Sequence, residues 1–333
     1  MTVIDCEGSS RSDESNRYAK AKELMPRNDH FDGRRFFNPT GPALQPFTAV
    51  PRMLLTRRAM WPAHVPDVPR QPPARGTASA VVTFIGHATF LIQTAAGNIL
   101  TDPIYSKYAG PWNLGPRRVR PPAIAFDALP PISIVLLSHN HYDHCDLHTL
   151  GMLAKRFDPL VVTPLGNGRF ARAAGIRRVE ELDWWQSAQG SSVPITLTPA
   201  HHFSARSPFD RNQALWGGFL LRVDDSRMYF AGDTAYAPFF QQIRERLGPI
   251  DLALLPIGAY EPRWFMQSVH MNPAEAVQAH LDLGATESIA MHFGTFQMTA
   301  EGIDEPVRAL EEARRARNVP ASAFRILGFG ESI

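Results

Sequence analysis

Three histidines and one aspartate stand within six residues of one another, in the segment Ser138-His139-Asn140-His141-Tyr142-Asp143-His144. Imidazole and carboxylate groups are ligands that Zn²⁺ favours, and Mn²⁺ and Fe²⁺ also accept them. In a loop, alternate side chains can turn toward one point, so His139 and His141 can share one metal ion while Asp143 and His144 bind a second. Ordinary hydrogen-bonding histidines are the alternative, which this concentration of ligand-type residues disfavours.

Further ligand-type residues follow strand-like segments downstream. Strands predicted at 193–198, 227–231 and 288–291 precede His201-His202, Asp233 and His292 respectively. Taken singly, a histidine in this position is more often a hydrogen-bonding residue, and a Gly-Asp pair is more often a turn. Because ligands gather at the C-terminal ends of strands in α/β sheets, these residues and the segment 138–144 together predict one shared metal site.

The elements around these residues predict an α/β fold. The segment 132–137 is almost wholly apolar, which is typical of a strand buried on both faces. Strands and helices alternate along both halves of the main domain, which argues for sheets covered by helices. Further strands are predicted at 81–85, 89–92, 98–101, 160–162, 215–222 and 251–255, and helices at 147–157, 236–247, 273–283 and 303–317.

Residues 1–78 differ from the rest, because they contain ten of the 29 prolines. We predict that they form an extension that wraps around a main domain at 79–333, with a short helix at 11–24 and an extended stretch at 62–73. The segment 50–61 combines Arg with Leu, Met and Trp, so it is a candidate for a peripheral membrane contact. Packing against the main domain is the favoured alternative, since prolines interrupt any helix there.

Composition excludes several classes of function. The 333 residues include 34 basic and 32 acidic ones, and a net charge of +2 gives no sign of nucleic-acid binding. Two cysteines cannot build a disulfide framework, and neither an apolar signal segment nor an 18-residue apolar run is visible. We therefore expect a cytoplasmic protein, with contact at the inner membrane face left open. A homodimer is compatible with the sequence.

The candidate ligands resemble those of the metallo-β-lactamase-fold hydrolases. Over about residues 80–310 the chain is similar to one branch, the N-acyl-phosphatidylethanolamine-hydrolysing phospholipase D family. The resemblance implies an α/β fold, a four-layer αβ/βα sandwich, here with an N-terminal extension. The segments that carry the resemblance to this branch are 138–144, 230–234, 256–266, 270–276 and 292–296.

The resemblance also implies roles for single residues. It places one metal ion on His139, His141 and His202. It places a second on Asp143, His144 and His292, with Asp233 bridging the two. His270 belongs to a family-like segment and is expected to line the substrate cleft, as a proton donor or a phosphate contact. The catalytic set expected from this reading is Asp143, Asp233 and His270.

Hydrolysis of a phosphodiester is the predicted reaction. Two Zn²⁺ ions, two aspartates and a hydroxide leave the site at about +1, which suits an anionic diester. The resemblance implies release of phosphatidic acid and an N-acylethanolamine from the parent lipid. A lactonase or phosphodiesterase of the same fold, acting on a soluble metabolite, is the alternative. An iron redox enzyme is disfavoured because that branch resembles a pattern with Glu where His141 stands. A binding module would predict a degraded ligand set, and all seven candidates are present.

Several nearby residues have two readings each. Asp102 and His87 either orient metal ligands or serve as a turn residue and a core histidine. Asp146 either stabilises the loop that contains the segment 138–144, called the metal loop below, or caps the following helix. Arg263 is expected in a carboxylate pair rather than on a phosphate. The role of Cys145 stays open.

Overall fold

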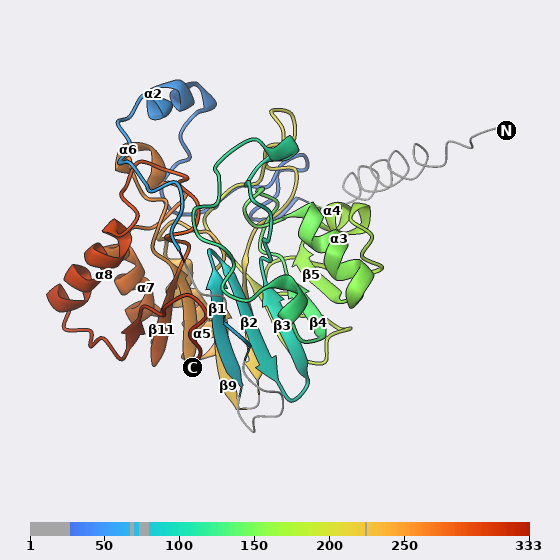
Figure 1. Cartoon of the computed structure of the whole chain (residues 1–333). Coiled ribbons are helices and arrows are strands. Elements are labelled where there is room, and N and C mark those ends of the chain that lie inside the picture. The colour runs from blue at the N-terminus through green and yellow to red at the C-terminus, as the bar shows by residue number, and fades with distance from the viewer. Residues whose placement is uncertain (1–26, 67–69, 73–79, 224) are drawn as a thin grey trace.

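The computed structural model describes residues 27–66, 70–72, 80–223 and 225–333 (Figure 1). The helix predicted at 11–24 lies outside these residues, and so does part of the proline-rich stretch 62–73. None of the helices in the described ranges has both the length and the hydropathy that crossing a bilayer requires.

The first sheet has six strands whose spatial order equals their chain order. They are β1 (Val81–Gly86), β2 (Thr89–Thr94), β3 (Gly97–Thr101), β4 (Ile132–Leu136), β5 (Leu160–Pro164) and β6 (Arg178–Leu182). Pairing is antiparallel from β1 to β3 and parallel from β3 to β6. The β1–β2 turn and the ends of β3 and β4 therefore lie at the same edge of this sheet.

The second sheet also has six strands, in the spatial order β12-β11-β10-β9-β8-β7. They are β7 (Ile195–Thr198), β8 (Gly218–Val223), β9 (Ser226–Phe230), β10 (Leu252–Pro256), β11 (Glu287–Met291) and β12 (Phe324–Arg325). Pairing is antiparallel from β7 to β9 and parallel from β9 to β12. The ends of β7, β9 and β11 therefore share one edge, as the ends of β3 and β4 do in the first sheet.

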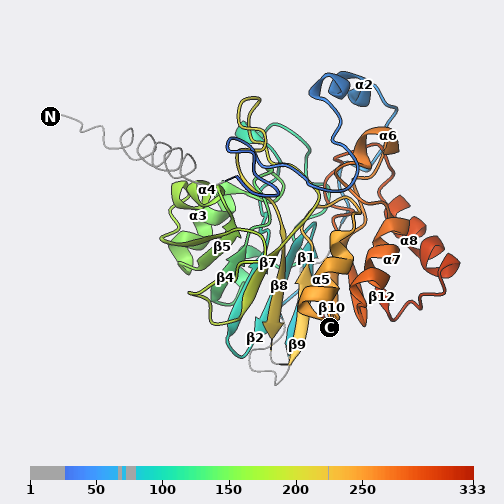
Figure 2. The same cartoon turned by 180° about the vertical axis from the view of Figure 1, so that it is seen from behind.

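Helices cover the outer faces of both sheets, which confirms the predicted αβ/βα sandwich (Figures 1 and 2). The helices α3 (Leu147–Arg156) and α4 (Gly168–Ala173) lie on the first sheet. On the second sheet lie α5 (Phe239–Leu247) and α7 (Pro273–Leu283), with α8 (Glu305–Ala316) packed on α7. Shorter turns of helix are η1 (Phe47–Ala49), α2 (Val50–Leu54), η2 (Pro111–Asn113), η3 (Phe126–Ala128) and α6 (Arg263–Met266).

Strand β4 shows how alternation along one strand builds two cores. Ile134 and Leu136 belong to the core between the sheets. Val135 and Leu137 belong to a second core, which they share with Leu150 of α3. Each fully buried aliphatic side chain stabilises the fold by roughly 1.5–3 kcal/mol. Burial on both faces therefore anchors the end of β4, where the histidine-rich loop begins.

Side-chain caps define where two helices next to that edge begin. Asp146 accepts a hydrogen bond from the backbone N–H of His148 at the start of α3. Asn272 and Glu275 form a capping box at the start of α7, with Pro273 in the first turn. These caps fix the residues at which the loops with the candidate site residues end and the helices begin. Asp146 thus caps the helix, one of the two roles expected for it.

The predicted strands and long helices are all present, and their ends differ from prediction by at most three residues. The strands β6 and β12 and the short helices α2, α4 and α6 were missed. Strand β6 is an edge strand whose Arg178, Glu180 and Glu181 are not buried. Its sequence therefore lacks the apolar pattern that identified the other strands.

Part of the N-terminal segment lies against the main domain. The Asn38 amide donates a hydrogen bond to the His202 carbonyl oxygen at 2.8 Å. The Trp61 indole N–H donates to the Glu301 carbonyl oxygen, also at 2.8 Å. These contacts hold two points of the segment on the main domain, while an extension at 1–78 that wraps the core stays a prediction.

The packing expected for 50–61 is only partly correct. Met53 lines a pocket, and Trp61 bonds to the main domain. In contrast, the side chains of Leu55 and Met60 are 86% and 97% exposed. The helix α2 has only five residues, with Pro51 near its start. No residue of α2 is fully buried, and Leu55 and Met60 follow the helix in the chain with their side chains in contact with solvent.

Candidate metal centre

The candidate ligands meet where the C-terminal edges of the two sheets come together. Loops after β4, β7, β9 and β11 supply them, so each half of the sandwich contributes. All are buried except His141, which is partly exposed. The residues brought together are His139, His141, Asp143, His144, His202, Asp233 and His292.

Three imidazoles form the first cluster, which consists of His139, His141 and His202. His141 Nδ1 lies 2.9 Å from His139 Nε2 and 3.2 Å from His202 Nε2. His202 Nδ1 donates a hydrogen bond to the Val269 carbonyl oxygen at 2.8 Å. That bond leaves the His202 Nε2 lone pair directed at the cluster, as a metal ligand requires.

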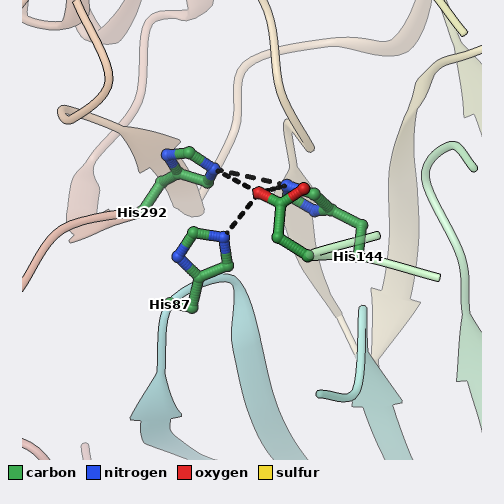
Figure 3. Close-up of side chains that lie close together, drawn as sticks. His87, His144 and His292 are labelled. Atoms are coloured by element: carbon green, nitrogen blue, oxygen red, sulfur yellow. Dashed lines mark hydrogen bonds and ion pairs between the residues drawn. The ribbon is translucent and has the colours of Figure 1, made fainter. Parts of the chain in front are cut away.

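The second cluster consists of Asp143, His144 and His292. Asp143 Oδ2 lies 3.2 Å from His144 Nε2 and 3.4 Å from His292 Nε2. A fourth residue, His87, places its Nε2 2.9 Å from the same oxygen. Figure 3 shows the rings of the three histidines turned toward one carboxylate group. The second cluster is therefore built around a carboxylate, unlike the first.

Asp233 lies between the two clusters. Its Oδ2 is 3.0 Å from His144 Nε2, and its Oδ1 is 3.2 Å from His292 Nε2. The same Oδ2 lies 3.9 Å from the Nε2 atoms of both His139 and His202. This placement is what a carboxylate shared between two metal ions needs.

Asp102 supports both clusters from behind. It accepts hydrogen bonds from His144 Nδ1 and from the Ser138 backbone N–H, both at 2.7 Å. The Ser138 hydroxyl also donates to Asp102 and lies 2.9 Å from His139 Nδ1. An ionised carboxylate only accepts, so His144 carries its proton on Nδ1 and directs the Nε2 lone pair at the site. Asp102 thus orients ligands, the first of the two roles expected for it.

His87 is part of the site rather than an isolated core histidine. It occupies the β1–β2 turn at φ +57°, where a side chain other than glycine is uncommon. Its N–H donates to Thr295 Oγ1 at 3.0 Å, and its carbonyl oxygen accepts from the His292 N–H at 2.8 Å. The turn of the first sheet is thereby tied to the loop that carries His292.

Burial dominates the electrostatics of the first cluster. It lowers the pKa of His141 to about 3 and that of His202 to about 4, and with neighbouring imidazoles it holds the pKa of His139 well below its usual value. All three rings are therefore neutral near pH 7, which is the form that binds metal ions.

Carboxylates dominate the second cluster. Burial opposes a charge on His144 and His292, but Asp233 and Asp143 outweigh it. They raise the pKa of His144 well above its usual value and that of His292 to about 9. Burial likewise opposes ionisation of both aspartates, yet His144 and its neighbours hold their pKa values well below the ordinary range. Protons on the two imidazoles therefore compensate the two ionised aspartates, and a cation that binds this cluster replaces those protons.

The donor set fits two metal ions. Ligand nitrogens around tetrahedral Zn²⁺ lie roughly 3.4 Å apart when the Zn–N distances are 2.0–2.1 Å. The nitrogens of the first cluster are 2.9 and 3.2 Å apart, so a small outward shift admits an ion. Asp233 Oδ1 is buried and accepts no hydrogen bond of acceptable geometry. A buried carboxylate oxygen in this situation is suited to bind a cation. The clusters match a binuclear metal site.

A pocket of about 350 Å³ opens onto both clusters. Five candidate ligands are among its lining residues and are called its polar floor below, namely His141, Asp143, His202, Asp233 and His292. The pocket thus combines a polar floor with walls that suit a hydrocarbon group. The apolar side chains of its walls include Val50, Met53, Phe203, Phe265, Met266 and Met298.

His270 also lines this pocket, where the sequence placed it. Its Nε2 lies 3.9 Å from Asp233 Oδ2, and the residue is 7% exposed. Burial lowers the pKa of His270 well below its usual value, so the ring is neutral. Arg263 donates to the His270 carbonyl oxygen at 3.0 Å and to both carboxylate oxygens of Glu275 at 2.9 Å. The carboxylate pair expected for Arg263 is confirmed.

Two other residues point away from the metal ligands. His201 lies in a different hollow, beside Trp184 and Trp185, which agrees with the choice of His202 as the ligand. Cys145 belongs to the core beneath α3, and burial raises the pKa of its thiol to about 11. A neutral thiol in that core does not bind the metal ions.

Sequence reasoning missed Arg206, which holds the metal loop in place. Its guanidinium donates to the carbonyl oxygens of Asn140 and Cys145, both at 2.8 Å. It also stacks 3.9 Å from the centroid of the Tyr142 ring, and the Tyr142 hydroxyl donates to the Arg206 carbonyl oxygen at 2.9 Å. Nothing in the local pattern around Arg206 indicates these contacts, because the two loops are far apart in sequence.

Relatives of this sequence include hydrolases. A family model described as a beta-lactamase superfamily domain matches residues 97–293. An uncharacterized protein of Mycobacterium tuberculosis is 40% identical over 252 residues, which cover 74% of this chain and 67% of that protein. The N-acyl-phosphatidylethanolamine-hydrolyzing phospholipase D 1 of Caenorhabditis elegans is 38% identical over 263 residues, covering 75% of this chain and 74% of that protein.

Solved structures show the same architecture. A possible metal-dependent hydrolase from Veillonella parvula gives a TM-score of 0.63 at 19% identity, covering 77% of this chain and 99% of that one. The isothiocyanate hydrolase from Delia radicum gut bacteria gives 0.60 at 19% identity, covering 76% and 98%. At such low identity these matches show the two-sheet fold alone.

Proposed function

This chain belongs to the metallo-β-lactamase superfamily as a metal-dependent hydrolase, and from that premise we propose a phospholipase D-type activity. The substrate is an N-acyl-phosphatidylethanolamine-like lipid, and the products are phosphatidic acid and an N-acylethanolamine. The metal ions are Zn²⁺, with Mn²⁺ or Fe²⁺ as alternatives. The relative from Caenorhabditis elegans, whose name states this activity, supports the choice of substrate.

The observation that carries the proposal is the shape of the site. A binuclear ligand set forms the polar floor of a pocket whose walls are largely Val, Met and Phe side chains. A polar floor for a phosphodiester and apolar walls for acyl chains are what a phospholipid requires. A small polar metabolite would leave those walls in contact with water.

The ligands divide into two sets and one shared residue. His139, His141 and His202 would hold one ion, and Asp233 would be shared between the two. When bound, the two ions supply a water-derived nucleophile near neutral pH and positive charge for the phosphoryl oxygens. Asp143, His144 and His292 would hold the second ion.

His270 acts on the leaving group. Its neutral ring faces the pocket beside Asp233, within reach of a bound diester. Because burial keeps the ring neutral, His270 donates a hydrogen bond to the leaving alkoxide oxygen rather than serving as an imidazolium acid, and the alkoxide gains the proton that the attacking water releases. Asp233 and Asp143 keep the floor of the pocket polar while the apolar walls exclude water.

Contact with a membrane is part of the proposal. Leu54, Leu55 and Met60 are exposed on and just after α2, and Met53 of the same helix lines the pocket. Arg52, Arg57 and Arg58 add positive charge that suits an anionic lipid surface. A cytoplasmic protein that binds the inner membrane face through 50–61 would take its substrate directly from the bilayer.

The experiment is a paired assay on protein of known zinc content. An N-acyl-phosphatidylethanolamine in mixed micelles and a soluble chromogenic phosphodiester are offered side by side, with and without a chelator. We expect chelator-sensitive release of phosphatidic acid, much faster than turnover of the soluble diester. A Leu54→Ser/Leu55→Ser/Met60→Ser variant should lose lipid turnover about tenfold and keep the soluble activity, because only the lipid requires docking.

The opposite result identifies the alternative. Turnover of the soluble diester alone, unaffected by the triple variant, would contradict a lipid substrate. The enzyme would then be a lactonase or phosphodiesterase that acts on a soluble metabolite. Small phosphodiesters and lactones would be screened next.

A further inference from the structure

Arg211 is a pocket residue that the proposed mechanism does not use. It lies in the loop between β7 and β8 and is partly buried. Among the described residues that line the pocket, it is the only lysine or arginine. The pocket therefore contains one permanent positive charge that belongs to the protein itself.

The described part of the chain offers Arg211 no carboxylate partner. Its guanidinium lies 5.2 Å from the centroid of the Phe203 ring, and no ion pair involves it. The neighbouring Asp210 is engaged elsewhere, since it accepts from the backbone N–H groups of Arg206 and Ser207 at 3.0 and 2.8 Å and lies 3.9 Å from Arg169.

Other positive charge surrounds Arg211. Arg35 donates a hydrogen bond to the Arg211 carbonyl oxygen at 2.8 Å. Burial and the Arg35 charge lower the pKa of Arg211. An arginine held beside another arginine, without a carboxylate, is disfavoured unless an anion is present to compensate.

The pocket walls do not supply that anion. Gln45, Val50, Met53 and Ala109 come from the segments 33–66 and 103–126, neither of which contains an Asp or Glu. Among the residues that the structure describes, the only carboxylates that line the pocket are Asp143 and Asp233, and both face the histidines of the two clusters. A bound substrate would therefore supply a negative charge that the described pocket residues do not offer to Arg211.

Arg211 is connected to the metal clusters through a single aromatic ring. Phe203 packs against His141 with ring centroids 4.5 Å apart and against His202 with centroids 5.1 Å apart. The Arg211 guanidinium lies over the same ring. An anionic substrate that reaches the clusters along this wall therefore passes the guanidinium.

We infer that Arg211 is a specificity-determining residue that binds an anionic oxygen of the substrate. The inference rests on the proposed diesterase function. Two sources share this chemistry: the non-bridging oxygens of the scissile phosphodiester, and a second anionic group elsewhere on the substrate. Arginine suits both, because its planar fork binds phosphate or carboxylate oxygens through two parallel hydrogen bonds.

The test measures binding to the full-length, zinc-loaded protein by calorimetry, so it does not depend on turnover. The probes are dibutyl phosphate, which is an anion, and tributyl phosphate, which is its neutral counterpart. A third probe is a butyl phosphodiester with a terminal carboxylate. The variants are Arg211→Gln and Arg211→Lys. Arg34→Gln is the matched control, because Arg34 is exposed, lies outside the pocket lining and carries the same charge.

We expect Arg211→Gln to weaken binding of the anionic probes about tenfold while leaving tributyl phosphate within about twofold. Arg211→Lys should restore part of the loss, and Arg34→Gln should match the wild type. An effect on dibutyl phosphate identifies the scissile diester as the contact. An effect confined to the carboxylate probe identifies a second anionic group.

Two results would overturn the inference. The first is that Arg211→Gln binds every anionic probe as the wild type does. The second is that it weakens the neutral probe as much as the anions, which would show a packing role. A wild-type protein that binds the anions through Arg211 but does not hydrolyse the lipid would contradict the proposed function and leave the inference intact.

Discussion

The two metal clusters differ in the groups that hold their ligands from behind. In the first cluster, His202 bonds to a backbone carbonyl and His139 contacts the Ser138 hydroxyl, both of which are neutral. In the second, His144 bonds directly to the buried carboxylate of Asp102. The candidate ligands of the second cluster also include a carboxylate, that of Asp143, and His87 Nε2 lies 2.9 Å from it.

This difference predicts unequal sensitivity to substitution. A negatively charged partner raises the basicity of a ligating imidazole and fixes its orientation, and its loss typically costs 10–100-fold in metal affinity. The second cluster has such partners in direct contact, whereas the first is reached by Asp102 only through Ser138. Substitution of a residue behind the second cluster should therefore lower the zinc affinity of that cluster more than that of the first. Substitution of the shared carboxylate should lower both affinities.

Replacing the shared carboxylate should cause the largest loss of zinc and of activity. Both clusters should lose zinc affinity together. Asp233→Asn removes the charge that both clusters contact, so zinc content should fall below two per chain and kcat/KM should fall by about a thousandfold or more. Elemental analysis and the soluble-diester assay measure the two quantities on one sample. Full activity with two bound zinc ions would show that Asp233 is not the bridge.

Replacing Asp102 should affect the second cluster most. Asp102→Asn removes the anionic acceptor of His144 Nδ1, so zinc affinity of the second cluster should fall about 100-fold, with a smaller loss at the first through Ser138. Competition with a chromophoric chelator resolves the two affinities. Asp127→Asn is the matched control, since its side chain is fully exposed. Equal losses in both clusters would contradict the asymmetry.

Replacing His87 should have a smaller effect, confined to the second cluster. His87→Phe keeps a ring beside His292 but removes the hydrogen bond to Asp143, so zinc affinity there should fall about tenfold. His87→Gln retains a donor and should recover part of that affinity. His280→Phe removes a buried histidine that bonds to Ser288 away from both clusters, so it should change neither affinity. A loss at the first cluster would indicate general damage to the fold.

Replacing His30, which lies outside both clusters, should have the smallest effect. It should change the stability of the fold and leave the zinc affinities unchanged. Burial opposes a charge on His30, but hydrogen bonds to Asp183 and Asp29 outweigh it and raise its pKa. The stabilisation by protonated His30 is therefore complete below about pH 6.5 and is lost as the pH rises through the raised pKa.

Denaturant unfolding of wild type and His30→Gln across this range measures that effect. The difference in free energy of unfolding should shrink as the pH rises, while zinc affinities stay unchanged. A difference that does not vary with pH would show that His30 is neutral in the folded protein.

Much of the fold could be predicted from the sequence because it follows from local patterns. Apolar runs such as 132–137 and helix signals such as Asn272-Pro273 depend only on neighbouring residues. The edge strand β6 escaped prediction because solvent permits charged side chains on it. The packing predicted for the segment 50–61 was partly wrong, since the five-residue helix α2 buries none of its residues and Leu55 and Met60 after it are exposed.

The chemical types and spacing of the ligands were determined by the sequence alone. Imidazoles and carboxylates placed after successive strands indicate a metal site, because parallel strands bring their C-terminal ends to one edge. Only the tertiary structure decided how those side chains are held. The bonds of Asp102 to His144, of His87 to Asp143 and of Arg206 to the metal loop join residues far apart in the chain.

The position of Arg211 beside Arg35 was likewise decided by the folded structure. The physical reason is that a hydrogen bond or a charge interaction depends on distances of a few ångströms in space. Sequence patterns report only which residues are neighbours along the chain.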